Sequence, residues 1–126
     1  MFIESLQLKN FRNYESLDLF PDPGTNILYG KNAQGKTNLL EAVYLCGTTK
    51  SHRGNRDREM IRFGEEESHI RMVVRKEAAT YRVDMHLRKN KAKGVAINGI
   101  PIHKAGELFG TVNLVFFSPE DLNIIK

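Results

Sequence analysis

The sequence predicts an α/β fold with an antiparallel β portion attached, and two observations support this class. The first is residues 25–47, in which an apolar strand pattern runs through a glycine pattern into a helical pattern. The second is a series of strand-like runs from residue 68 onward: SHIRMVVR, YRVDMHLR, KGVAIN and GIPI. The 126 residues, 40% hydrophobic and 27% charged, are enough for one domain with a modest core.

The amino-terminal part is predicted to contain three strands. Residues 2–8 (FIESLQL) alternate apolar and polar side chains, as half-buried strands do. A second short strand is predicted at residues 16–19, followed by a turn at PDPG, residues 21–24. Residues 25–29 (TNILY) are then expected to form a buried strand that leads directly into the glycine pattern.

A helix is predicted directly after the glycine pattern. Leu39, Val43 and Cys46 have the spacing of one helix face, and Gly47 is the expected stop. Strand, glycine loop and helix in this order form the context that a phosphate-binding loop requires.

The second half is predicted to be rich in strands. Residues 48–67 are polar and charged and carry no clear secondary-structure pattern. Asn98-Gly99 is a good two-residue hairpin turn, because both residues tolerate a positive φ. Residues 105–109 are expected to form a short helix, and residues 113–118 a buried strand that Pro119 stops.

Residues 30–37, GKNAQGKT, match the pattern G-x-x-x-x-G-K-[ST]. The glycines permit a tight loop whose backbone amides surround a β-phosphate, and the positive end of the next helix adds to that field. Lys36 is expected to reach the β- and γ-phosphates, Thr37 to offer its hydroxyl to Mg²⁺, and Asn38 to contact the α-phosphate. The expected nucleotide-binding residues here are Gly30, Lys31, Asn32, Ala33, Gln34, Gly35, Lys36, Thr37 and Asn38.

The motif predicts a P-loop NTPase fold that binds a purine nucleotide with Mg²⁺. The loop alone leaves ATP and GTP open. A GTP-binding protein normally carries an Asn-Lys-x-Asp motif, and Lys89-Asn90-Lys91 lacks the aspartate, so the sequence favours ATP.

Composition restricts the setting of the protein. No apolar run exceeds five residues, and the alternating amino terminus is unlike a secretion signal. The single cysteine, Cys46, excludes an internal disulfide and suits a reducing cytosol, so we expect a cytoplasmic protein. The net charge of +4 favours anionic partners. The histidines, at positions 52, 69, 86 and 103, lack metal-ligand spacing and are expected to be surface or hydrogen-bonded residues.

Four stretches resemble the RecF family of bacterial recombinational-repair ATPases, which is related to the SMC and Rad50 heads and more distantly to ABC ATPases. They are LKNFRNYES (8–16), GKNAQGKTNLLEAVY (30–44), SHRGNRDREMIRFG (51–64) and VFFSPEDL (115–122). The first two are shared with the wider SMC/Rad50 group, and the last two indicate the RecF family.

This resemblance implies an ATP-dependent DNA clamp or loader that acts at gaps and single-strand/double-strand junctions. It also implies RecO and RecR as partners in recombinase loading, a role in the SOS response, and an ATP-dependent homodimer of the full-length protein. By the match to the group's "NFR" element, Arg12 and Asn13 would lie beside the nucleotide, where a guanidinium can neutralise phosphate oxygens or stack on the base. The alternative for Arg12 is a surface arginine at a strand end.

Two hydrolysis elements of the related ATPases are missing from the sequence. A Walker B segment needs an apolar run ending in Asp-Glu, which neither VDMH (83–86) nor VFFSPED (115–121) supplies, and no ABC-type signature is present. We therefore expect residues 1–126 to be the amino-terminal lobe of an ABC/SMC-type ATPase head, with both elements beyond residue 126.

In that arrangement VFFSPEDL would occupy the place of the group's Q-loop. Glu120 is then the first candidate for a catalytic or Mg²⁺-binding carboxylate, and Asp121 the second. An equally supported alternative is that both carboxylates cap the next helix.

Two basic stretches are candidates for DNA contact through phosphates. RKNKAK (88–93), expected at a hairpin tip, supplies Arg88, Lys89, Lys91 and Lys93, although a solvated turn is the usual fate of such a run. For residues 50–62 the resemblance suggests a loop over the adenine side of the nucleotide, so Arg53 or Arg56 could serve ATP, DNA or solubility.

Other functions remain open at this stage. A small P-loop nucleotide or metabolite kinase would need an arginine-bearing lid, which the β-rich second half does not suggest. A transporter-type ABC ATPase subunit would lack the KNFRNY element, and a non-catalytic nucleotide-sensing module fits the chain taken by itself. We expect the chain to bind nucleotide with little or no turnover.

Overall fold

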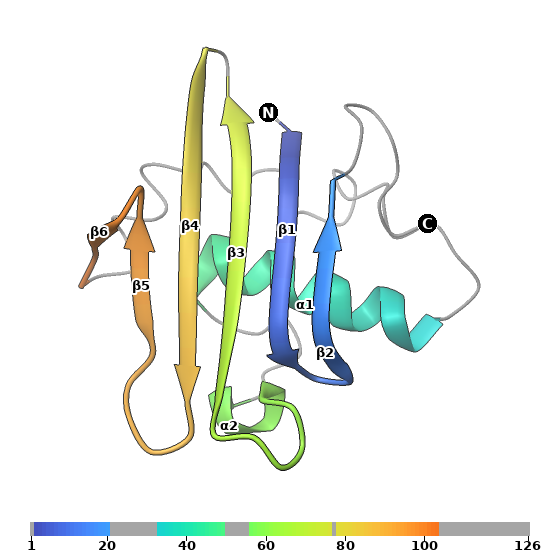
Figure 1. Cartoon of the computed structure of the whole chain (residues 1–126). Helices are drawn as coiled ribbons and strands as arrows, with labels where there is room; N and C mark the ends of the chain where they lie inside the picture. The colour runs from blue at the N-terminus through green and yellow to red at the C-terminus, as the bar shows by residue number, and fades with distance from the viewer. Residues whose placement is uncertain (1, 21–32, 50–55, 77, 104–126) are drawn as a thin grey trace.

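The computed structural model describes residues 2–20, 33–49, 56–76 and 78–103. Within these ranges it contains one six-stranded sheet, in the order β2-β1-β3-β4-β5-β6, in which every neighbouring pair is antiparallel (Figure 1). The elements are β1 (Phe2–Phe11), β2 (Tyr14–Leu19), α1 (Ala33–Thr48), α2 (Asp57–Met60), β3 (Glu67–Lys76), β4 (Ala79–Arg88), β5 (Gly94–Ile97) and β6 (Ile100–Pro101).

The core lies between one face of the sheet and α1, which crosses behind the central strands in Figure 1. Alternation along the strands directs one apolar set to this face, while the polar set between them faces away from α1. Complete burial of one such side chain stabilises the fold by about 1.5–3 kcal/mol. The buried apolar side chains of these elements are Leu6, Leu8, Phe11, Ala42, Val43, Leu45, Cys46, Ile70, Met72, Val74, Val83, Met85 and Leu87.

The strand predictions that fall on described residues are confirmed. The amino-terminal strand continues to Phe11, and the strand predicted at 16–19 begins at Tyr14. Asn98 and Gly99 have φ values of 52° and 83°, as a tight hairpin turn between β5 and β6 requires. Residues 88–93 cover the end of β4 and its connection to β5, as expected.

The helix is longer than predicted, and its expected stop is wrong. Helix α1 begins at Ala33, inside the glycine pattern, and ends at Thr48, so Gly47 is a buried residue of its last turn. The left-handed residue that follows is Thr49, with φ 68°, whose N–H donates to the carbonyl of Leu45 at 2.8 Å. This hydrogen bond satisfies a terminal carbonyl in the way a glycine at this position usually does.

Four further predictions lie outside the described residues: the turn at 21–24, the strands at 25–29 and 113–118, and the helix at 105–109. Among the described residues, no helix is long and apolar enough to cross a membrane.

Candidate functional site

The turn between β1 and β2 presents Arg12 and Asn13 to the side of α1. The backbone reverses sharply here, and Arg12 has a φ of 53°, in the left-handed region that only a minority of side-chain-bearing residues adopt. From α1, the amide of Asn38 donates to Oδ1 of Asn13 at 3.0 Å. The turn is thereby joined to the helix that follows the glycine pattern.

Arg12 and Glu41 form the strongest polar contact of this site. Nε of Arg12 lies 2.7 Å from one carboxylate oxygen of Glu41, and Nη2 lies 2.9 Å from the other. The Glu41 side chain is completely buried, whereas that of Arg12 is 22% exposed. Two parallel charge-assisted hydrogen bonds of this kind fix the plane of a guanidinium as well as its position.

The residues around α2 hold Arg12 from the other side. Its Nη1 donates to the carbonyl of Glu59 at 3.0 Å, and its backbone N–H donates to the carbonyl of Met60 at 2.8 Å. An isolated antiparallel β-bridge between the backbones of Phe11 and Ile61 lies next to these hydrogen bonds. Arg12 therefore connects three segments that are far apart in the sequence, and it is not a loose strand-end arginine.

Glu41 was missed in the sequence, although a signal for it exists. It is the only charged residue within LLEAVYLC, a segment whose other residues are apolar or weakly polar. A carboxylate that is fully removed from water requires a partner, because its desolvation costs several kcal/mol. A lone acid in an apolar helix shortly after a P-loop motif therefore predicts a cationic partner from another segment.

The first turns of α1 contain the second half of the glycine pattern. Helix α1 includes the backbone of residues 33–37, and the half-buried Thr37 lies immediately before Asn38. Asn38 is 3% exposed, and its described partner is Asn13. Residues 30–32, the side chains of 33–36, and Glu120 lie outside the described part of the chain.

A cationic hollow of about 560 Å³ lies beside this turn. Three arginines and one lysine line it against a single acidic residue, and Phe63 at its edge is 99% exposed. Its described lining is Arg12, Arg58, Glu59, Ile61, Arg62, Phe63, Gly64 and Lys89. Such a surface attracts phosphate groups and offers an aromatic face for stacking.

The basic run at 88–93 divides into two groups. Lys93 pairs with Asp57 of α2 at 2.9 Å and also donates to the carbonyl of Thr49, and its side chain is 25% exposed. Nη2 of Arg88 donates to the carbonyl of Ala92 at 2.7 Å, so a hydrogen bond joins the two ends of the β4–β5 connection. Lys91 is exposed, so this end of the run faces solvent, whereas Lys93 attaches the connection to α2.

Known proteins share the sequence and the fold of this chain. Residues 5–119 match the family model described as an AAA domain. The chain belongs to the AAA-domain family. It is 71% identical over all 126 residues to the DNA replication and repair protein RecF of Agathobacter rectalis, and 65% identical to that of Lachnospira eligens. The chain spans 35% of the length of each of these relatives.

Solved structures of a RecF protein and of an SMC ATPase have the same fold as this chain. The structure of the recombination mediator protein RecF-ATP in the RecFOR pathway superposes with a TM-score of 0.83 at 36% identity, over 99% of this chain and 35% of that one. A structure from a study of ATP-driven dimerization of SMC ATPases gives a TM-score of 0.75 at 17% identity, over 98% of this chain and 84% of that one, which supports the fold alone. The resemblance to RecF and the predicted fold class are confirmed.

Proposed function

We propose that residues 1–126 form the amino-terminal nucleotide-binding lobe of an ABC/SMC-type ATPase head and bind ATP with Mg²⁺. The observation that carries this proposal is the attachment of the β1–β2 turn, within KNFRNY (residues 9–14), to α1. The Arg12–Glu41 and Asn13–Asn38 contacts make this attachment. This attachment holds two expected nucleotide contacts beside the helix that the P-loop motif opens. The similarity to a structure named RecF-ATP supports the choice of nucleotide.

Each residue of the motif has a role in this proposal. The backbone amides of residues 30–35 surround the β-phosphate, and Lys36 neutralises the β- and γ-phosphates. Arg12 has five N–H donors on its guanidinium, and its described side-chain hydrogen bonds use three of them. The remaining N–H groups can meet a phosphate oxygen without breaking the pair with Glu41.

The residues available for Mg²⁺ fit the chemistry of that ion. Thr37 carries a hydroxyl in the first turns of α1, and hydroxyl and carboxylate oxygens are the hard donors that Mg²⁺ prefers. Glu120, with Asp121 second, is the proposed carboxylate. When bound, Mg²⁺ supplies charge neutralisation on the terminal phosphates.

Titration with a fluorescent ATP analogue tests the nucleotide site. The wild-type chain is expected to bind the magnesium complex, and Lys36→Ala to bind it at least about tenfold more weakly, since a charge-assisted contact to phosphate is worth about 1.5–3 kcal/mol. Lys91→Ala is the matched control, because it removes an exposed cation from the β4–β5 connection and leaves the motif intact. Equal affinity of Lys36→Ala and wild type would contradict the proposal.

The larger protein is proposed to be a RecF-like ATPase of DNA repair, recombination and replication in the cytoplasm. Its proposed DNA substrate is single-stranded or gapped double-stranded DNA, and RecR, RecO and an ATP-dependent second copy are the proposed protein partners. The names of the similar proteins support this reading, and so does the cationic hollow that contains Arg58, Arg62 and Lys89. In this proposal the chain itself turns over little ATP, because Walker B and signature residues are supplied from outside it.

A further inference from the structure

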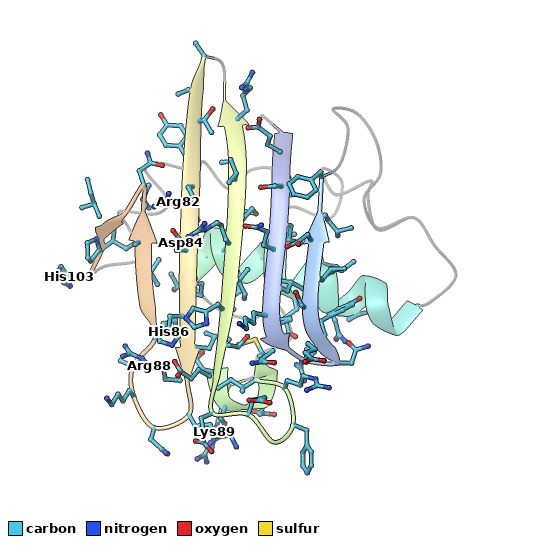
Figure 2. All side chains as sticks on the ribbon, in the orientation of Figure 1. Arg82, Asp84, His86, Arg88, Lys89 and His103 are labelled. Atoms are coloured by element: carbon cyan, nitrogen blue, oxygen red, sulfur yellow. The ribbon has the colours of Figure 1, made fainter. Side chains whose placement is uncertain are left out.

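A cluster of two histidines and one glutamate lies on the face of the sheet opposite α1. His69 in β3 and His86 in β4 are directly paired across the two strands. Their rings stack with centroids 4.1 Å apart and planes 16° from parallel. Glu67 lies on the same face of β3, and its carboxylate is hydrogen-bonded to Nε2 of His86. Figure 2 shows His86 on β4 between the labelled side chains of Asp84 and Arg88.

The three side chains can supply ligand atoms to one point in space. One nitrogen from each histidine and one carboxylate oxygen of Glu67 lie within 4.8 Å of one another. Tetrahedral zinc, with bonds of about 2.0–2.1 Å, needs its ligand atoms about 3.3 Å apart. Closing the separation from 4.8 Å to about 3.3 Å is a change of about 1.5 Å that also turns the two rings out of their stacked arrangement, and the exposed Glu67 and His69 can rotate about their side-chain bonds.

The electrostatic surroundings allow a cation at this point. The negative charge of Asp84 already engages Arg71 at 2.6 Å and Arg82 at 2.9 Å. Two cations among the described residues oppose an ion here. Lys9, the partner of His69 on β1, is exposed and can extend into solvent, and Arg88, the partner of Glu67 on β4, donates to the carbonyl of Ala92.

A hollow of about 540 Å³ gives access to the cluster from solvent. His69 and His86 are part of its lining, together with Gly94 of β5. Gly94 is the cross-strand partner of His86 and has no side chain to cover the ring on that side. Water can reach both histidines through this hollow.

We propose that Glu67, His69 and His86 form a binding site for a divalent transition-metal ion of the Zn²⁺ type, with water as the fourth ligand. Two imidazoles favour Zn²⁺ and its first-row neighbours over Mg²⁺, which prefers oxygen ligands. The site is separate from the nucleotide site, because its ligands alternate along β3 and β4 with the buried residues that face α1. The bound ion would also cross-link β3 to β4.

Zinc competition against a chromogenic chelator tests the site on the full chain without nucleotide. One Zn²⁺ per chain is expected to be removed from the chelator, and His69→Gln and His86→Gln are each expected to weaken binding at least about tenfold, the loss seen for disturbed metal sites. His103→Gln is the matched control, an exposed histidine outside the cluster. Absence of stoichiometric binding, or equal binding by wild type and both cluster variants, would overturn the proposal.

Two measurements guard against variants that simply fail to fold. Co²⁺ added to the wild type should give the visible absorption of a low-coordinate nitrogen/oxygen site, and Zn²⁺ should remove it. Zn²⁺ should also raise the thermal midpoint of the wild type, because a ligand of the native state stabilises it, and should leave a His69→Gln/His86→Gln double variant unchanged. A wild type without the Co²⁺ spectrum, or a double variant that keeps the midpoint shift, would each count against the site.

Discussion

The buried carboxylate of Glu41 in α1 accepts two parallel hydrogen bonds from the guanidinium of Arg12 at the β1–β2 turn. The pair joins segments that are 29 residues apart in the sequence, and both segments belong to motifs that suggest nucleotide binding. The salt bridge is therefore expected to have two effects: it stabilises the fold, and it orients Arg12 toward a phosphate.

The first prediction concerns the stability that this pair provides. Arg12→Ala leaves the completely buried Glu41 carboxylate without its described ion-pair partner. Breaking a buried pair in this way costs about 3–5 kcal/mol, and the 22% exposure of Arg12 favours the low end, about 3 kcal/mol. Urea unfolding followed by circular dichroism measures the loss.

A double-mutant cycle separates the pair from other effects of truncation. In a Glu41→Leu background, Arg12→Ala is expected to cost much less, because no buried charge remains. Arg12→Lys should recover only part of the stability, since an ammonium cannot form the two parallel hydrogen bonds. If Arg12→Ala costs the same in both backgrounds, the guanidinium contributes through packing and not through Glu41.

The second prediction distinguishes two lysines of the 88–93 run. Lys91 is exposed, so its charge is available to DNA, and Lys91→Gln is expected to reduce the slope of log affinity against log salt by about 0.9 for one lost phosphate contact. Its free energy of unfolding should stay within about 0.5 kcal/mol of wild type. Filter binding over a salt series checks the first expectation. An unchanged slope would show that Lys91 does not contact a DNA phosphate and is only a solvent-exposed lysine.

Lys93 is expected to behave in the opposite way. Its ammonium pairs with Asp57, and both side chains are about three-quarters buried, with exposed fractions of 25% and 24%. Lys93→Gln should therefore lower the free energy of unfolding by about 1 kcal/mol, the upper end for ion pairs near the surface. Asp57→Asn should cost a similar amount, and the two losses should not add. Full additivity would show that the pair does not form in solution.

The strands were predictable because a sheet with one buried face imposes a period of two on its sequence. YRVDMHLR keeps this period over its whole length, and FIESLQL keeps it from Ser5 onward, after a register shift between Ile3 and Ser5; both are strands in the structure. The end of α1 was not predictable in the same way. Gly47 is the usual residue for a helix stop, but it is buried inside the last turn, and Thr49 takes the left-handed conformation instead.

The candidate sites show a similar limit. Arg12 and Asn13 were found through a motif, whereas Glu41 was not singled out in the sequence, and its role is evident from the guanidinium that contacts it. His69 and His86 look unrelated in the sequence because they are 17 positions apart. They meet only because β3 and β4 pair in one particular register, and a shift by one residue would place them on opposite faces.

The third prediction concerns the single cysteine. Cys46 is completely buried in α1, and burial, with a smaller effect of the Asp84 charge, raises the pKa of its thiol far above the usual value. The thiolate is the reactive form, so alkylation by iodoacetamide at pH 8 should be very slow in the native chain and fast in urea. Mass spectrometry follows the reaction. Native alkylation at the rate of the unfolded chain would contradict the burial of this helix face.

The fourth prediction concerns the turn between β5 and β6. Gly99 has a φ of 83°, and a Cβ added there would lie 3.4 Å from Nη2 of Arg82. Gly99→Ala must hold an L-residue in the left-handed region, which costs about 1–2 kcal/mol, and the free energy of unfolding should fall by that amount.

Gly94→Ala provides the matched control for this turn. Its φ is not in the left-handed region, and the nearest atoms to an added Cβ are 3.8 Å away, at ordinary contact distance. Because alanine has less conformational freedom than glycine in the unfolded chain, this variant should be as stable as the wild type or slightly more stable. Parallel urea titrations compare the two variants. If both lose the same free energy, the cost arises from added bulk at this edge of the sheet, and the conformation of Gly99 is not its cause.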